Sequence, residues 1–209
     1  MRTTGSIGVA AAVAILVGVG TTAATAPSSA EDTAPIVLDI LEDAAVGQMV
    51  DGSVEAEAGG VDVSIPADIT EPLTLSTDDG SALSLQLPQA DGSMESEADG
   101  ERASVTHDLG DGSSLVPLVR EDGVVQVLSV LEQPESPSSF AYVFSSPEGS
   151  RVALSADGGA EVFGDDGDSI ATVGAPWATD GAGESVPTHF IVEESTLTQV
   201  VDISGLDSV

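Results

Sequence analysis

The sequence predicts an all-β protein whose strands pair mainly antiparallel, in a meander or in sandwich-like sheets. Apolar and polar residues alternate along many short segments from Val61 onward, which is the pattern of strands with one buried face. Asp-Gly dipeptides separate many of these segments at intervals typical of antiparallel folds. No long helical pattern interrupts them, which argues against a parallel α/β sheet.

The expected strands follow the alternation. Most of these segments place apolar residues at every second position, with small or polar residues between them. Because successive side chains of a strand point to opposite faces, one face packs on a core and the other meets water. The segments lie at residues 61–65, 73–75, 83–87, 124–130, 141–144, 152–154, 170–173, 189–192 and 197–203.

The Asp-Gly dipeptides mark the expected hairpin turns. This dipeptide tolerates the positive φ angles that tight two-residue turns require, so it is a strong local hairpin signal. The residues on either side do not recur in register, which indicates a meander and not a sequence repeat. The dipeptides begin at Asp51, Asp79, Asp91, Asp99, Asp111, Asp122, Asp157, Asp166 and Asp180.

The N-terminus has the pattern of an export signal, residues 1–30, which is expected to form a signal-peptide helix. Arg2 supplies an early positive charge, and residues 7–20 form an apolar run. This run is shorter than the roughly 20 residues that a membrane-spanning helix needs, so an uncleaved anchor is the less favoured alternative. Cleavage is expected after Ala30, with Ala24 as the second choice. The sequence therefore predicts a secreted or cell-envelope-associated protein.

The remaining chain divides into an N-terminal extension, residues 31–60, and a β-rich domain, residues 61–209. In the extension, apolar residues recur at helical spacing over residues 33–47 and predict one short helix. Residues 88–102 are acidic and almost free of large apolar groups, which predicts an exposed loop. Residues 132–139 contain two prolines and predict a crossover or a boundary between two lobes, and one continuous sheet system is preferred.

The composition argues against two classes of partner. The chain has a net charge of −32 and contains no lysine, and removal of residues 1–30 would change the charge to −33. Nucleic acids are bound largely through lysine and arginine on phosphates, and anionic membranes attract polybasic segments. We therefore expect neither nucleic acid nor stable membrane insertion of the processed chain. With no cysteine, the fold holds together without disulfides.

The sequence indicates no serine hydrolase site. His107 and His189 are the only histidines, and no Gly-x-Ser-x-Gly elbow is present. His107 precedes Asp108, but adjacent residues on a strand point to opposite faces, so the pair does not form part of a triad. His189 lies in an alternating segment and is expected on a sheet face.

Other catalytic and cofactor sites are equally unsupported. With 36 acidic residues, chance pairs of carboxylates carry no information about glycosidase chemistry, and Trp177 and Tyr142 are the only tryptophan and tyrosine available to stack on sugars. Two distant histidines without a thiol make a poor zinc site. The sequence therefore assigns no catalytic, cofactor-binding or metal-binding residue.

Calcium binding is the strongest of the metal hypotheses. Asp165, Asp166 and Asp168 surround Gly167, and carboxylate oxygens are the ligands that Ca²⁺ prefers. The spacing does not match an EF-hand loop, and the nonapeptide repeat of calcium-binding β-rolls is absent. An ordinary Asp-Gly hairpin with an additional acid is the preferred interpretation.

The carboxy-terminal third carries the most distinctive motif. Residues 176–188 read PWATDGAGESVPT, and residues 197–202 read LTQVVD. With Val63 to Pro66 and Gly80 to Pro88, these segments resemble a module of exported actinobacterial proteins of uncharacterised function, over about residues 61–202. The resemblance implies an exported β-rich module and no catalytic or ligand-binding residue.

The motif also has a physical interpretation. Pro176 and Pro187 are expected at the starts or edges of strands, because proline cannot donate a hydrogen bond within a sheet. Trp177 is expected to be a buried anchor between sheets or lobes, in preference to an exposed binding platform.

Together these patterns predict a non-enzymatic, exported, acidic β protein that acts through protein contacts. Two alternatives remain open at this point. One is an envelope-directed hydrolase whose site is assembled from scattered residues. The other is a structural module stabilised by calcium.

Overall fold

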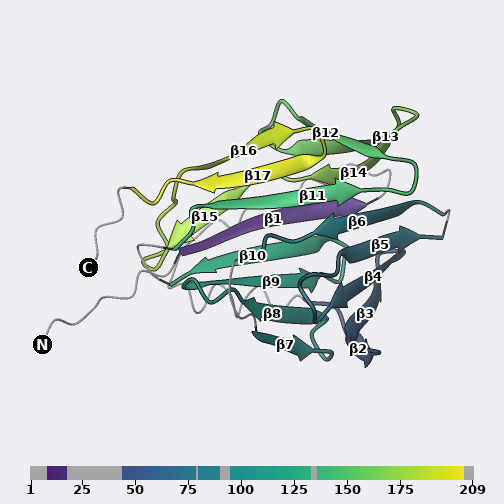
Figure 1. Cartoon of the computed structure of the whole chain (residues 1–209), viewed down its shortest axis with the longest axis horizontal. Coiled ribbons are helices and arrows are strands. Elements are labelled where there is room, and N and C mark those ends of the chain that lie inside the picture. Colours follow the sequence, from purple (N-terminus) through teal and green to yellow (C-terminus); the bar gives the residue numbers. More distant parts are fainter. Residues whose placement is uncertain (1–8, 18–43, 79, 90–94, 133–135, 205–209) are drawn as a thin grey trace, which may run out of the picture.

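The computed structural model describes residues 9–17, 44–78, 80–89, 95–132 and 136–204. Within these residues all the regular secondary structure is β-strand. The strands form two antiparallel sheets that pack face to face (Figure 1). The predicted all-β, antiparallel fold is confirmed. The described residues contain no helix long and apolar enough to cross a membrane.

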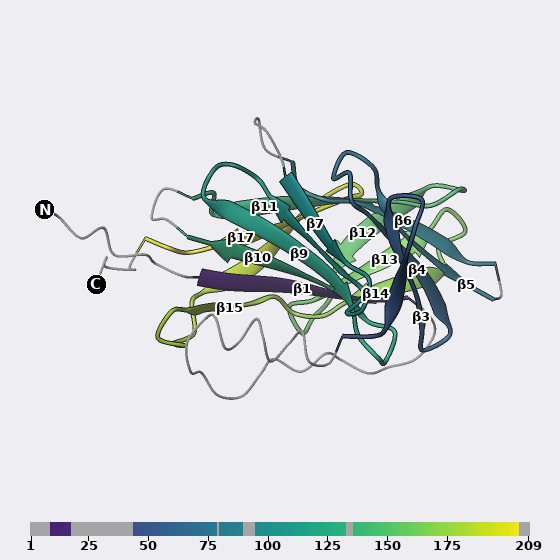
Figure 2. The ribbon, with the colours of Figure 1, turned by 90° about the horizontal axis from the view of Figure 1, so that it is seen from below.

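The first sheet has nine strands among the described residues, and β1 lies in its interior (Figure 2). Strand β15 (Trp177–Asp180) pairs with β1 on the same side as β14. The other strands run in the order β12 (Ser150–Leu154), β13 (Ala160–Gly164), β14 (Ser169–Val173), β1 (Val9–Val17), β10 (Val125–Leu131), β9 (Ser113–Val119), β8 (Ser104–Asp108) and β7 (Glu95–Asp99).

The second sheet has eight strands among the described residues. Its two edges are β16 and β2. Strands β2 to β6 follow one another both in the chain and in the sheet, and most of them are joined by short hairpins. The strands run in the order β16 (Thr188–Glu193), β17 (Thr196–Val201), β11 (Ser139–Ser145), β6 (Ala82–Gln86), β5 (Leu73–Thr77), β4 (Val61–Pro66), β3 (Ser53–Ala58) and β2 (Gly47–Val50).

The alternating pattern produces the core between the sheets. In β11, Phe140, Tyr142 and Phe144 are buried, while the residues between them are exposed. A single apolar cluster combines these side chains with inward-facing residues of both sheets. The Tyr142 hydroxyl and the Ser129 hydroxyl of β10 lie 3.3 Å apart, so a buried hydrogen bond also joins the two sheets.

The Asp-Gly dipeptides form hairpin turns, as predicted, at most of their described positions. The glycine has a positive φ at Gly52, Gly80, Gly112, Gly123, Gly158 and Gly167. The aspartates contribute as well: an Asp oxygen accepts the backbone N–H two residues later, as at Asp122 and Asp166. A share of the acidic residues therefore shapes turns, in addition to giving the surface its charge.

Of the predicted signal peptide the structure describes Val9–Val17, and these residues form strand β1 instead of the expected helix. β1 pairs with β10 on one side and with β14 and β15 on the other. A short apolar run cannot by its periodicity alone distinguish a helix from a strand buried in a sheet. Here the neighbouring strands supply backbone partners on both sides, and the run is extended.

The second expected helix, residues 33–47, lies outside the described residues except for its last four. These four are extended: Ala44 forms a bridge with Arg120, the Ala45 N–H donates to the Val119 carbonyl at 2.7 Å, and Gly47 begins β2. The sheet thus includes β2 and β3, which the sequence placed in an N-terminal extension, and it begins before Val61.

Two segments that interrupt the alternation have different structures. The loop expected over residues 88–102 contains β7, which pairs with β8 along its whole length. An edge strand has only one strand partner and needs few apolar residues, which is why composition concealed it. The proline-containing segment 132–139 leads from β10 in one sheet to β11 in the other, so it is a crossover between sheets.

Candidate functional site

Strand β2 is an edge strand with exposed apolar side chains. Met49 is 51% exposed and Val50 41%, and Val46, immediately before the strand, is 79% exposed. The other large apolar residues exposed in the described part lie on three different strands, at Val143, Leu154 and Ile191. An edge strand presents unpaired backbone groups to solvent, and proteins usually protect such edges with charged side chains. An apolar edge is therefore a candidate binding surface.

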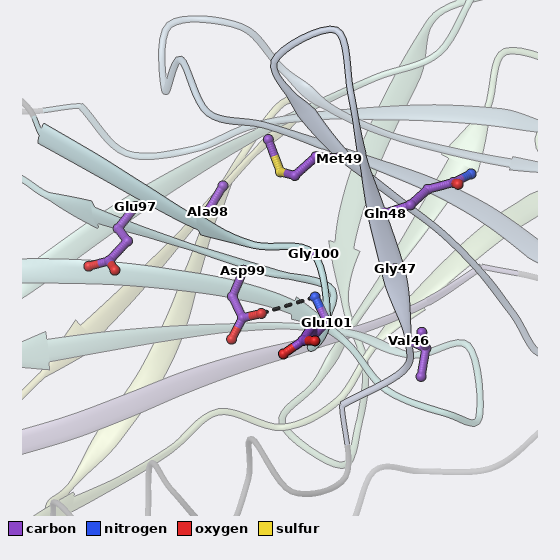
Figure 3. A pocket seen from close by; sticks show the side chains of 9 residues that line it. All are labelled: Val46, Gly47, Gln48, Met49, Glu97, Ala98, Asp99, Gly100 and Glu101. Carbon is purple, nitrogen blue, oxygen red and sulfur yellow. Dashed lines mark hydrogen bonds between the residues drawn. The ribbon is translucent and has the colours of Figure 1, made fainter.

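A cleft of about 690 Å³ lies between β2 and the end of β7 (Figure 3). Residues 46–49 line one wall, and residues 97–101 line the other. In Figure 3, Met49 and Gln48 lie on the β2 side, while the Glu97 and Asp99 carboxylates lie across the cleft. The Asp99 carboxylate accepts the Glu101 N–H at 3.0 Å, which holds the turn that closes this wall.

The backbone of β2 is oriented toward this cleft. The Gly47 N–H donates to the Gly100 carbonyl at 2.9 Å, so the Gly47 backbone points away from β3. Alternate residues of a strand direct their backbone groups to the same side, so those of Met49 also point away from β3. Gly100 lies close to β2, since an added Cβ would lie 3.2 Å from the Met49 nitrogen, a tight contact. The two edges therefore converge at Gly100.

A second cleft, of about 430 Å³, lies beside the same strand. Residues 46–48 line it together with Glu55 and Glu57 of β3 and Asp62 of β4. Carboxylates therefore border the β2 edge in both clefts. Among the described residues, six acidic residues line the two clefts: Glu55, Glu57, Asp62, Glu97, Asp99 and Glu101.

This arrangement fits recognition of an extended peptide. The Gly47 N–H is bound to Gly100, so the outward-directed backbone groups of Met49 are the ones that offer hydrogen bonds. The apolar side chains offer buried contact, and the surrounding carboxylates favour positive charge on the ligand. The sequence analysis missed the site because it assigned residues 33–47 to a helix. The signal that could have revealed it is the apolar Met49-Val50 pair directly before Asp51-Gly52, where a hairpin strand must end.

The structure separates the candidate catalytic residues of the sequence. His107 is buried on β8, Asp108 is exposed on the opposite face, and His189 is exposed on β16 in the other sheet. The opposite facing of His107 and Asp108 is as predicted. Sequence reasoning missed one pair: the Ser96 hydroxyl of β7 lies 2.8 Å from Nδ1 of His107.

The Ser96 and His107 pair lacks the third member of a triad. Nε2 of His107 is buried and has no hydrogen-bond partner among the described residues. The Asp68 carboxylate interacts electrostatically with His107, but its Oδ1 accepts from the backbone and hydroxyl of Thr70. Nucleophilic catalysis requires that the base be oriented by a further group, and no described group orients His107 from its second nitrogen.

Burial lowers the pKa of His107 to about 4, although the Asp68 carboxylate opposes this shift. In the unfolded chain this histidine is expected to titrate near pH 6.5. Between these two values the unfolded state binds more protons than the folded state, so stability falls as the pH falls through this window.

We expect His107→Gln to remove this dependence. The stability of the original protein relative to the variant should fall by up to about 3 kcal/mol between pH 7 and pH 4. Urea unfolding of both proteins at several pH values measures this difference, in which the shared repulsion among acidic residues cancels. A difference that stays constant across the range would show that His107 is not buried as a neutral imidazole.

The segment considered for calcium binding, residues 165–168, forms an Asp-Gly turn. Residues 165–168 connect β13 to β14, with Gly167 at φ +88° and its N–H donating to Gly164. The Asp166 carboxylate accepts the Asp168 N–H at 3.0 Å. No group of three or more His, Cys, Asp or Glu within the described residues is arranged to hold a metal ion.

The distinctive carboxy-terminal motif builds a corner between the two sheets. Pro176 and Pro187 directly precede β15 and β16, which confirms their predicted position at strand starts. The Gln199 side chain donates to the Trp177 carbonyl at 3.5 Å, and the Thr188 hydroxyl donates to the Val200 carbonyl at 2.8 Å. These bonds join the three parts of the motif, so its role within the described structure is to connect β15 with β16 and β17.

The sequence predicted that Trp177 is a buried anchor between the sheets, and the structure does not place it there. It is half-buried and packs against a separate cluster of Val116, Leu118 and Leu128. Its neighbour Ala178 is buried in the main core, and the alternation of β15 therefore places the indole on the opposite face of the sheet.

Comparisons of the chain with models of protein families, with curated proteins and with solved structures found no match. The resemblance to exported actinobacterial modules therefore stays a prediction.

Proposed function

We propose that this protein is exported and acts without catalysis, by binding an extended, positively charged segment of another polypeptide at the β2 edge. The observation that carries the proposal is the apolar edge formed by Val46, Met49 and Val50 between two clefts lined by carboxylates. Export is supported by the sequence pattern of residues 1–30.

The edge supplies the affinity in this proposal. The Gly47 N–H is already bound to Gly100, so a bound strand would take its backbone hydrogen bonds from the outward-directed groups of Met49. Its successive side chains, which point to opposite faces, would contact Met49 on one face and Val50 on the other. The cleft against β7 gives the strand a second wall. Truncation of a central apolar side chain in such an interface commonly weakens binding by about tenfold or more.

The carboxylates supply selectivity for charge. Glu55, Glu57 and Asp62 border one side of the strand, while Glu97, Asp99 and Glu101 border the other. Successive side chains of a strand point to opposite faces, so a ligand that alternates apolar and basic residues would place its basic side chains beside one of these two sets. A net charge of −32 attracts any cation weakly, so the apolar contact at Met49 is what distinguishes the site from general attraction.

We expect an eight-residue peptide of alternating valine and lysine to bind, and Met49→Ala to weaken this binding by about tenfold. Isothermal titration calorimetry measures both affinities at physiological salt. The matched control is Ile191→Ala, since Ile191 is 47% exposed on β16, the opposite edge of the same sheet. This control should change the affinity by less than twofold.

A second peptide of alternating valine and glutamate separates charge selectivity from edge binding. It should bind at least tenfold more weakly than the lysine peptide, because its glutamate side chains would lie beside cleft carboxylates of the same charge. The proposal fails if Met49→Ala binds the lysine peptide as well as the original protein does, because general attraction to acidic surface then explains all binding.

A further inference from the structure

Residues 9–17 combine two properties that conflict after export. The sequence pattern places them in the apolar centre of a segment that signal peptidase removes. In the structure they form β1, an interior strand of the nine-stranded sheet, with β10 on one side and β14 and β15 on the other (Figure 2). Removal of the segment would therefore open a slot in the middle of the sheet.

The slot has two long facing edges. Seven residues of β1, from Val9 to Ile15, pair in register with β10. On the other side, Val9 to Ala12 pair with β15, and Ile15 to Val17 pair with β14. Without β1, the backbone groups on these edges would lose their partners, and unpaired buried backbone groups are costly. An empty slot is thus unfavourable.

The positions along the slot are lined by buried groups of β10. Val125, Val127 and Leu131 face the main core, and Leu128 is buried on the opposite face. The residues of β1 in register with them are Ile15, Val13, Val9 and Ala12. Uncharged side chains of this size suit both rows, and a charge would be placed beside apolar groups without a partner.

Trp177 lies on the edge of the slot and directly contacts the strand that fills it. It pairs with Ala12 of β1, and Ala12 pairs in turn with Leu128 of β10. Trp177 also packs against the cluster that includes Leu128, which lies beyond β1 in the sheet. Since Trp177 is the only tryptophan of the chain, its fluorescence reports on this row alone.

We propose that the processed protein is a strand acceptor, whose slot between β10 and the β14–β15 edge binds an uncharged, extended apolar segment of a partner polypeptide, antiparallel to β10. β1 occupies this slot in the unprocessed chain and shows what it accepts: about seven small or β-branched residues. The inference rests on the export that the proposed function assumes. It concerns a different surface from β2, which selects a cationic ligand.

The first test adds the peptide of residues 8–18 to the protein purified after export and processing. We expect near-stoichiometric binding, a blue shift of Trp177 emission and a rise in Tm of about 5–10 °C at saturation. The matched control is the same peptide with Val13→Pro, because proline lacks the N–H that an interior strand needs. The control peptide should produce neither change.

A second test uses the unprocessed chain, whose lack of cysteine makes disulfide trapping clean. Ala14→Cys with Gln126→Cys, an in-register pair, should form a disulfide, whereas Ala14→Cys with Leu128→Cys should not. Absence of the in-register disulfide would overturn the slot. Absence of any response to the peptide of residues 8–18 would overturn the acceptor role, since the chain then closes the slot itself. Neither result depends on binding at β2, which Met49→Ala tests.

Discussion

Gly123→Ala is expected to destabilise the protein by about 2–4 kcal/mol, well beyond the usual effect of a surface turn substitution. Gly123 has φ +83°, which an L side chain adopts only with strain. An added Cβ would also lie 2.6 Å from the carbonyl oxygen of Ala58, the last residue of β3 before the β3–β4 turn of the other sheet. Backbone atoms cannot move aside as a flexible side chain does, so the two turns must separate.

Gly167→Ala is the matched control for this effect. Gly167 has φ +88°, donates its N–H within an equivalent Asp-Gly turn, and has nothing within 4 Å of an added Cβ. It should cost only the backbone strain, about 1–2 kcal/mol. Urea unfolding measures both variants. Equal destabilisation by the two substitutions would mean that the β3–β4 and β9–β10 turns are not in contact.

Phe144→Ala is expected to cost about 3–5 kcal/mol of unfolding free energy, the range for truncation of a buried aromatic side chain. Phe144 is 1% exposed and belongs to the cluster shared by both sheets. The cavity would lie between the sheets, where neighbouring side chains come from opposite directions and can relax only in part. Thermal or urea unfolding measures the loss.

The neighbour of Phe144 on the same strand provides the control. Val143 is 39% exposed, and Val143→Ala should change stability by less than about 1 kcal/mol. The comparison is sensitive to register, because a shift of one residue along β11 exchanges the buried and exposed faces. A larger effect at Val143 than at Phe144 would contradict the observed register.

The sequence was sufficient for the fold class because two local signals agree. Alternation in segments such as β4 and β11 identifies strands with one buried face, and Asp-Gly identifies the turns between them. Both signals are carried by neighbouring residues. The pairing of strands distant in the chain, such as β6 with β11, depends on how the sheets pack, which no local pattern encodes.

The failures have physical causes as well. Residues 9–17 have the composition that predicts part of an export signal, but they form a strand, because their extended form depends on strands more than 100 residues away. Strand β7 was hidden because all its side chains except that of Ala98 are polar, and only its pairing with β8 shows it. The β2 edge was hidden because exposure of Met49 depends on β2 having a strand partner on one side only.

The acidic residues have structural roles that the composition alone does not reveal. Several aspartates that look like surface charge hold turns, as Asp122 does by accepting the Val124 N–H at 3.3 Å. Others, such as Glu57 and Glu97, line the clefts beside the apolar edge, where we propose that they favour a cationic ligand. Net charge argues against classes of partner, but the fold was needed to show where charge meets exposed apolar surface.

The central functional claim is that a cationic, extended ligand docks on β2, and amide chemical shifts of the isotope-labelled protein test it most directly. On addition of the valine–lysine peptide, shifts should concentrate at Val46 to Val50 and at Glu97 to Glu101, and should vanish in Met49→Ala. Small shifts spread evenly over the acidic surface, or shifts centred on the opposite edge at β16, would contradict the claim.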